Sequence, residues 1–180
     1  MIKNAVVFGG ANGSKKYLDL AYDLGRVLAK NGFVTVTGGG PGMMHEVNRG
    51  AFEAGGESIG IRINHTEQIS IEFFTSHEMH DKFQARHDAL LKRGDAFVAL
   101  PGGLGTILEI VDITQRKKFK EIAVEVPLIL ISNYFKPLLN VFHEIAQEGF
   151  IREDLEEMYQ YAKNPQEVVN ILKKNSSLRG

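Results

Sequence analysis

The sequence predicts an α/β fold in which a mostly parallel, doubly wound β-sheet is covered by helices on both faces. Short apolar segments of strand character alternate with longer segments whose apolar residues recur at helical spacing. Such alternation is typical of right-handed βαβ crossovers, which place successive strands in parallel. Glycine-rich loops directly follow three of the apolar segments, at the strand ends where this architecture binds ligands. We therefore expect a single Rossmann-like domain spanning residues 1–180.

The composition agrees with one α/β domain in the cytoplasm. Of the 180 residues, 43% are hydrophobic and 24% are charged, and the formal net charge is −1. A net charge this close to zero gives no excess of basic residues that would attract nucleic acid or an anionic membrane. No apolar run approaches the roughly eighteen residues of a membrane-spanning helix. Cysteine is absent, which excludes disulfides and thiolate metal sites. We expect a cytoplasmic protein with no nucleic-acid partner and no membrane partner.

Two strand–loop–helix units occupy the first part of the chain. The segments 5–8 and 33–37 are short and apolar or β-branched, which predicts strands. The helix after the first strand should end at Asn31-Gly32, because glycine readily adopts the left-handed conformation that closes helices. The second helix follows Pro41, a residue favoured in the first helical turn, and continues to about Gly55.

Two more strands, a polar loop and a helix are expected in the middle of the chain. The strands cover 57–63 and, more briefly, 72–75. The polar segment 64–70 between them should form a surface loop or a lid over the cleft. A helix then runs from about Met79 to Arg93. Its buried positions should include Phe83, Leu90 and Leu91.

The second half of the chain repeats the alternation. A fully apolar strand over 96–100 precedes a helix that continues to about Lys120. The basic run that ends this helix suits the negative end of the helix dipole and should be solvated. The remaining expected segments are, in order, a strand over 126–132, a helix closing at Gly149, an edge strand over 158–161, a helix opening at Asn164-Pro165 and a frayed tail over 173–180.

Three glycine-rich loops, 9–14, 38–44 and 101–105, each follow a predicted strand. They should converge on one cleft, because the carboxyl ends of parallel strands meet at the same edge of a sheet. The run of three glycines from Gly38 carries a high cost in backbone entropy, so something must approach this backbone closely. We favour a ligand; a tight turn packed against a neighbouring strand is the alternative. The expected ligand contacts in this loop are Gly39, Gly40, Gly42 and Met43.

The loop after the strand 96–100 is the most informative stretch of the chain. Pro101 ends the strand because it has no N–H, and the glycines after it let the backbone turn around a ligand. A helix starting at Thr106 would then point free N–H groups and the positive end of its dipole at one spot. The residues expected to hold a phosphate are Gly102, Gly103, Leu104, Gly105 and Thr106.

Thr106 and Glu109 also have the spacing of a capping box, in which both side chains would only stabilise the start of a helix. A cap does not need the glycines in front of Thr106, and this favours a ligand site.

The stretch Pro101-Gly-Gly-x-Gly-Thr-x-x-Glu109 resembles the signature of the Lonely-guy (LOG) family, often labelled "lysine decarboxylase-like". The likeness covers roughly residues 5–172, and Arg86 occupies the place of an arginine that completes the family's site. The resemblance implies a LOG-like nucleotide-binding domain and a homodimer. It also implies a nucleoside 5′-monophosphate phosphoribohydrolase, which would cleave AMP or cytokinin riboside monophosphates to a free base and ribose 5-phosphate. No cofactor is expected.

Arg86 and Glu109 are the expected catalytic residues. N-glycosidic hydrolysis passes through an oxocarbenium-like transition state, which a carboxylate near C1′ stabilises. Glu109 fits this role, whereas Arg86 acts electrostatically because a guanidinium does not release its proton near neutral pH. Arg86 lies beside the apolar stripe of its helix, where an anionic partner is needed. A core carboxylate such as Asp95 is the alternative partner to a ligand phosphate.

Histidines are the remaining polar candidates. The spacing of His77, His80 and His87 fits no common set of metal ligands, so no metal site is expected. His87 takes the position of a lysine in many LOG relatives and is expected to contact the substrate. His45 replaces a glutamate of those relatives. These two departures keep open a second function, a nucleotide or cofactor carrier without turnover.

Lysine decarboxylation is excluded on chemical grounds. Such reactions normally need pyridoxal phosphate on a lysine Schiff base. Lys82 and Lys92 lie on a predicted helix among polar neighbours, and no lysine has a convincing position at a loop end.

Overall fold

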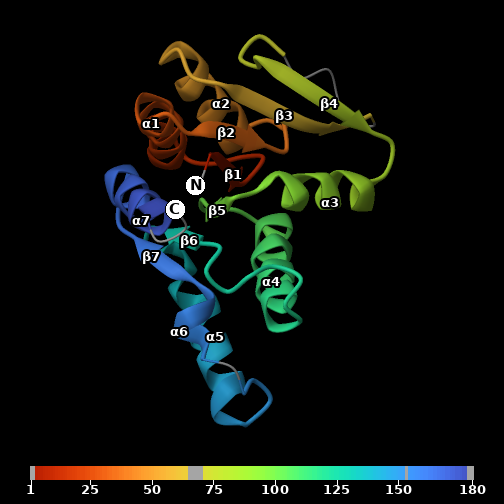
Figure 1. Ribbon diagram of the computed structural model, residues 1–180, viewed down its shortest axis with the longest axis vertical. Helices are drawn as coiled ribbons and strands as arrows, with labels where there is room; N and C mark the ends of the chain where they lie inside the picture. The colour runs from red at the N-terminus through yellow and green to blue at the C-terminus, as the bar shows by residue number, and fades with distance from the viewer. Residues whose placement is uncertain (1–2, 65–70, 153, 178–180) are drawn as a thin grey trace.

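The computed structural model describes residues 3–64, 71–152 and 154–177, which form one seven-stranded parallel sheet with helices on both faces (Figure 1). The strand order is β4-β3-β2-β1-β5-β6-β7, and every neighbouring pair is parallel. The strands are β1 (Asn4–Phe8), β2 (Val34–Thr37), β3 (Ser58–Ile63), β4 (Ser76–His80), β5 (Ala96–Ala99), β6 (Leu128–Ile131) and β7 (Gln160–Ala162). The predicted fold class is confirmed.

Helices connect these strands in the expected alternation. They are α1 (Lys15–Lys30), α2 (Met43–Glu53), α3 (Phe83–Arg93), α4 (Leu104–Lys118), α5 (Lys136–Gln147), α6 (Leu155–Met158) and α7 (Pro165–Ser177), with a 3-10 turn, η1 (Asn133–Phe135), before α5. As predicted, α1 closes at Gly32 and α5 at Gly149, both in the left-handed region. None of the helices within the described residues has the length and apolarity needed to cross a membrane.

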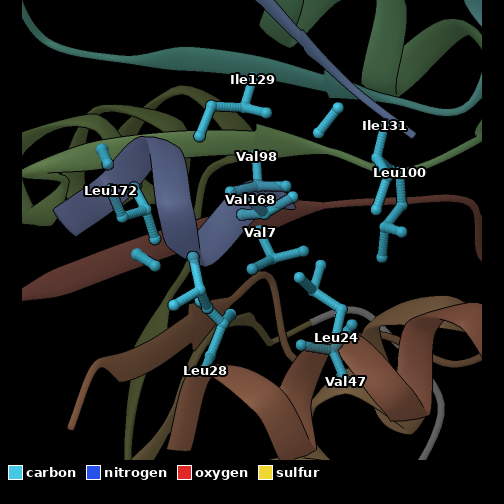
Figure 2. Close-up of a cluster of buried hydrophobic side chains, with 14 of the residues drawn as sticks. Val7, Leu24, Leu28, Val47, Val98, Leu100, Ile129, Ile131, Val168 and Leu172 are labelled. Carbon is cyan, nitrogen blue, oxygen red and sulfur yellow. The ribbon is translucent and has the colours of Figure 1, made fainter. Parts of the chain in front are cut away.

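Alternate residues of the central strands bury into two separate cores. Val7 and Val98 face one core, which α1, α2 and α7 cover with residues such as Leu24 (Figure 2). Phe97 of β5 faces the other core, against α3, α4 and residues such as Ile110. Because both faces are covered, these strands consist mostly of apolar or β-branched residues, and this is why the sequence predicts them well.

The order of the strands reverses at β1, which has β2 on one side and β5 on the other. The loops that follow these three strands therefore share one edge of the sheet. The N–H of Gly10 donates to the carbonyl of Pro101 at 3.1 Å, and the N–H of Met43 donates to the carbonyl of Gly10 at 3.0 Å. The predicted convergence of the three glycine loops is confirmed.

The predicted strand over 72–75 is wrong, because β4 lies at Ser76–His80 and pairs with β3. Its sequence, Ser-His-Glu-Met-His, is polar because β4 is an edge strand with mostly exposed residues. The helix after it consequently begins at Phe83, four residues later than the predicted Met79. Phe83 is 48% exposed and not buried as predicted, whereas Leu90 and Leu91 are buried as expected.

Helix α4 begins at Leu104 and has Gly103 as its N-cap. Thr106 lies within the first turn, so the capping-box interpretation of Thr106 and Glu109 is wrong. The helix α4 therefore begins two residues earlier than the predicted start at Thr106.

Two further expectations about helix ends need correction. Lys117 belongs to the basic run expected to be solvated, but it is 2% exposed and donates to the carbonyls of Val124 and Met158. Helix α7 continues to Ser177, past the predicted start of fraying at Lys173. The segment 65–70, most of the predicted lid, lies outside the described residues.

Candidate active site

The loops after β1 and β5 enclose a hollow of about 280 Å³ at the reversal point of the sheet. Its lining comprises Asn12, Gly13, Tyr17, Met43, Pro101, Gly102, Gly103 and Tyr134. Three predicted ligand contacts, Met43, Gly102 and Gly103, are thereby brought together. Met43 is 1% exposed and forms the floor at the start of α2.

The first turn of α4 has backbone N–H groups without partners in the helix, at the place where the sequence predicts an anion site. The N–H of Ile107 is the first to bond within the helix, to the carbonyl of Gly103 at 3.1 Å. The N–H groups of the residues between them precede this bond and are available to a ligand at the positive end of the dipole. The turn contains no acidic side chain, and a Cβ placed on Gly103 or Gly105 would meet open space. Leu104 is 86% exposed, whereas Thr106 is buried.

Two tyrosines in the hollow were not predicted from the sequence. The hydroxyl of Tyr134 donates to the carbonyl of Gly102 at 2.8 Å, which ties η1 to the central glycine loop. The ring of Tyr17 meets the Tyr134 ring edge-on, with centroids 5.9 Å apart. A signal was available, because Tyr134 lies three residues after the end of β6 and so belongs to the same edge of the sheet as the glycine loops.

Arg86 reaches from α3 to the second glycine loop. Its Nε donates to the carbonyl of Ile61 at 2.9 Å, and its Nη2 donates to the carbonyl of Gly38 at 3.1 Å. Burial lowers the pKa of Arg86, and the nearby charge of Glu109 opposes this effect. The alternative partner, Asp95, instead accepts from the backbone N–H groups of Lys3 and Asn4.

Side chains of the protein itself approach the glycine run 38–40. A Cβ on Gly38 would collide with Nη2 of Arg86, and one on Gly40 would lie 2.5 Å from Cε of Met44. Gly39 has a φ of 61° and packs against the Arg62 side chain. Gly42, with a φ of 65°, abuts the carbonyl of Ala11 in the first loop. Other groups therefore do approach the backbone of these glycines closely, as predicted, and in the structure these groups are atoms of the protein itself.

Glu109 lies one turn into α4, on the side that faces Arg86. Burial raises the pKa of Glu109 from 4.5 to about 8, against the smaller opposing effect of the Arg86 charge. Among the described residues the two side chains form no direct salt bridge, so their charges interact across a gap. A half-buried carboxylate with a raised pKa beside an arginine is typical of a reactive site.

The histidines take different positions. His87 is 3% exposed, and its Nε2 bonds Oδ2 of Asp112 at 2.8 Å. Its Nδ1 has no hydrogen-bond partner among the described residues. Because Nδ1 is also buried, the predicted contact of His87 with a substrate stays a prediction. His45 packs edge-on against Phe73, with ring centroids 5.3 Å apart. In the parts of the chain that are described, no group of three or more His, Asp or Glu side chains could hold a metal ion.

Comparison with known proteins identifies the family. The family model described as "Possible lysine decarboxylase" matches residues 44–172. A rice (Oryza sativa subsp. japonica) protein named probable cytokinin riboside 5′-monophosphate phosphoribohydrolase is 30% identical over 175 residues, 95% of this chain and 72% of the relative. The chain belongs to the LOG family. A LOG relative from Rhodococcoides fascians, named cytokinin riboside 5′-monophosphate phosphoribohydrolase, is 31% identical over 83% of this chain and 78% of its own length.

The LOG fold is shared with proteins of a different name. The molybdenum cofactor carrier protein from Chlamydomonas reinhardtii has a TM-score of 0.74, with 98% of this chain and 99% of that chain covered. The two sequences are 24% identical, so this likeness shows the fold alone.

The raised pKa of Glu109 predicts a pH-dependent stability. The folded state retains the Glu109 proton up to about pH 8, whereas the unfolded chain loses it near 4.5. The contribution of this group to stability is therefore complete below about pH 4.5 and is lost as the pH rises toward 8. Glutamine does not ionise, so the wild type should lose stability relative to Glu109→Gln between about pH 5 and pH 8, by on the order of a few kcal/mol.

Denaturant unfolding of both proteins at the two pH values measures this difference. Glu57 is exposed, so Glu57→Gln supplies a control in which a carboxylate is lost from the surface. A Glu109→Gln difference that does not vary with pH would contradict a raised pKa.

Proposed function

We propose that this LOG protein is a nucleoside 5′-monophosphate phosphoribohydrolase, which cleaves the N-glycosidic bond of AMP or of cytokinin riboside monophosphates. The observation that supports this most strongly is the pair formed by Arg86 and Glu109 beside the open N-terminus of α4. Relatives at about 30% identity that are named cytokinin riboside 5′-monophosphate phosphoribohydrolases support the same reaction class. The products are a free base and ribose 5-phosphate, and no cofactor takes part.

The 5′-phosphate binds at the N-terminus of α4 in this proposal. The N–H groups of 104–106 donate to its oxygens, and the helix dipole adds to the attraction. Gly103 and Gly105 leave room for the phosphate because a Cβ at either position would already face open space. Glu109 follows one turn later on the same helix, so the sugar of a bound nucleotide lies between the phosphate site and the Arg86–Glu109 pair.

Hydrolysis breaks the bond between C1′ and the base nitrogen and forms a bond from C1′ to a water oxygen. Positive charge develops on the sugar, and ionised Glu109 stabilises this charge and orients the water. The proton of the water leaves with the base. Arg86, held by two backbone carbonyls, keeps its charge fixed next to the reacting centre.

A decarboxylase function is not proposed, despite the description of the family model. The buried lysine, Lys117, lies in the last turn of α4 and donates to backbone carbonyls, away from the glycine loops. Lys82, the N-cap of α3, and Lys92, on α3, are exposed. The described lining of the hollow includes no lysine that could form a Schiff base.

The second candidate is a nucleotide or cofactor carrier. The fold shared with the molybdenum cofactor carrier protein favours it. His45 and His87, which depart from the residues that the resemblance implies for many LOG relatives, favour it as well. A carrier would use the same anion site without bond cleavage. A cytoplasmic location stays a prediction under either function, and a role in cytokinin biosynthesis stays a prediction under the hydrolase function.

The phosphate site predicts that AMP binds at least about tenfold more tightly than adenosine, because only AMP has the charged group that α4 attracts. Gly103→Asp should abolish this preference by placing a carboxylate at the N-cap, in open space. Gly103→Asn has the same shape without the charge and should retain it. Isothermal titration calorimetry of each variant with both ligands measures the preference. Equal affinity of the wild type for AMP and adenosine would rule out the phosphate site.

The hydrolase proposal predicts that incubation with AMP or an N6-substituted AMP yields equal amounts of free base and ribose 5-phosphate. Glu109→Gln should reduce kcat by on the order of a hundredfold or more while AMP binding is retained, because the charge that stabilises the transition state is lost. If ionised Glu109 is the reactive form, kcat/KM of the wild type should rise with pH up to about 8. Chromatographic detection of the base measures both. A wild type that binds AMP but releases no base from any purine monophosphate would favour the carrier.

We also propose that the protein is a homodimer that pairs through α3 and α4. These helices flank the Arg86–Glu109 pair and expose large apolar side chains, namely Phe83 at 48%, Leu104 at 86% and Leu108 at 46%. Leu104 and Leu108 are four residues apart and share one face of α4. Such a patch beside the site is the expected surface for a second copy.

Light scattering at micromolar concentration should give twice the mass of one chain, and Leu108→Lys should shift it toward one chain by placing a charge in the apolar contact. Val141 on α5 is 48% exposed, so Val141→Lys is a matched control that should leave the mass unchanged. A wild type with the mass of a single chain would refute the dimer.

A further inference from the structure

The two proposed catalytic residues lie on different helices. Arg86 belongs to α3 and Glu109 to α4, and no direct salt bridge joins them within the described chain. Their separation therefore depends on whatever holds α3 against α4. A change of about 1 Å in such a pair is enough to cost two orders of magnitude in rate.

A set of four side chains joins α3 to α4 next to this pair. We call His87, Asp88, Asp112 and Arg116 the α3–α4 clamp. Nε2 of His87 bonds Oδ2 of Asp112 at 2.8 Å, and Nη2 of Arg116 donates to Oδ1 of Asp88 at 2.9 Å. Nε of Arg116 also donates to Oδ2 of Asp112 at 2.9 Å. One carboxylate oxygen thus receives a bond from each helix.

The clamp continues the geometry of the proposed catalytic pair. His87 and Asp88 directly follow Arg86 on α3. On α4, Asp112 and Arg116 lie three and seven residues after Glu109, so all three occupy one face of the helix. Three consecutive residues of α3 therefore face three consecutive turns of α4: Arg86 faces Glu109, His87 faces Asp112, and Asp88 faces Arg116. A shift of the clamp would move Arg86 relative to Glu109.

Burial makes the bond between His87 and Asp112 the strongest part of the clamp. The His87 side chain is 4% exposed and the Asp112 side chain 27%, whereas the Asp88 side chain is 51% exposed. The ring of Phe83 stacks on the His87 ring at 6.0 Å and covers it. A hydrogen bond to a charged group in such a place holds its geometry far better than an exposed ion pair does.

We propose that Asp112, through His87, is a positioning residue that sets the separation of Arg86 and Glu109. This proposal rests on the proposed hydrolase function for its kinetic consequence, but its structural consequence does not require turnover. In this role, the bond between His87 and Asp112 affects the reaction only by holding α3 at a fixed distance from α4.

Three variants separate positioning from charge. Asp112→Leu removes the acceptor for His87, whereas Asp112→Asn removes the charge but keeps an amide oxygen that can accept the same bond. Glu121→Gln is the matched control, because Glu121 pairs with Arg116 at 3.4 Å but does not contact His87. If Asp112→Leu does not fold, Asp112→Ala removes the acceptor without adding bulk.

Kinetics with AMP give the first readout. Asp112→Leu should lower kcat by about tenfold to a hundredfold with little change in KM, because the phosphate site at the start of α4 is intact. Asp112→Asn should recover most of the lost kcat, and Glu121→Gln should match the wild type. A purely stabilising role would lower the unfolding temperature of Asp112→Leu and leave kcat unchanged, and this result would overturn the proposal.

The second readout is the titration of Glu109 followed by carbon NMR of its carboxyl group, which needs no turnover. Helices that separate admit water, so the pKa of Glu109 should fall further in Asp112→Leu than in Asp112→Asn, which loses the same charge. Equal pKa values in these two variants would overturn the proposal. If the wild type releases no base, the hydrolase function fails, and the titration alone decides whether the clamp positions Glu109.

Discussion

Crowding of backbone at the reversal of strand order is the constraint on which the site depends. The loops after β1, β2 and β5 meet at one edge of the sheet, where backbone atoms hydrogen-bond directly from loop to loop. A side chain at Gly42 would overlap the carbonyl of Ala11, and one at Gly102 would overlap Thr106. With glycine at these positions, α2 and α4 begin beside the same hollow. The packing of the backbone thus brings two positive helix ends to one place, where the sequence predicts an anion.

The same crowding explains the electrostatics of Arg86 and Glu109. Gly38 has no Cβ, so the guanidinium can approach its carbonyl and that of Ile61. Arg86 is thereby held by neutral acceptors, and Glu109 loses water without gaining a direct ionic partner. A carboxyl group whose pKa is raised in this way opposes folding at neutral pH and above. Such a cost is expected at a functional site and not in a core that only stabilises the fold.

The sequence predicts the parts of this structure that local pattern controls. The strands β1, β2, β5 and β6 are rich in apolar or β-branched residues because both faces are buried, and Gly32 and Gly149 end their helices as expected. The position of the edge strand β4 was not predicted correctly, because its exposed residues are mostly polar and lack the apolar pattern of a buried strand. A motif singled out Arg86 and Glu109 as candidates. No motif singled out Tyr17, Tyr134 or Asp112, because their positions depend on how distant helices and loops pack, and no short sequence pattern encodes such packing.

The burial of Glu109 also bears on the choice between hydrolase and carrier. A carrier gains only from attractive contacts with an anionic ligand, and a buried carboxyl group next to the phosphate site provides no charge that would attract it. A hydrolase gains from the same group, because binding energy lost in the ground state matters less than charge stabilisation in the transition state. In addition, a group with a pKa of about 8 exchanges its proton close to physiological pH, which a passive binding site does not need. The position of Glu109 is therefore easier to explain by catalysis than by storage of a ligand.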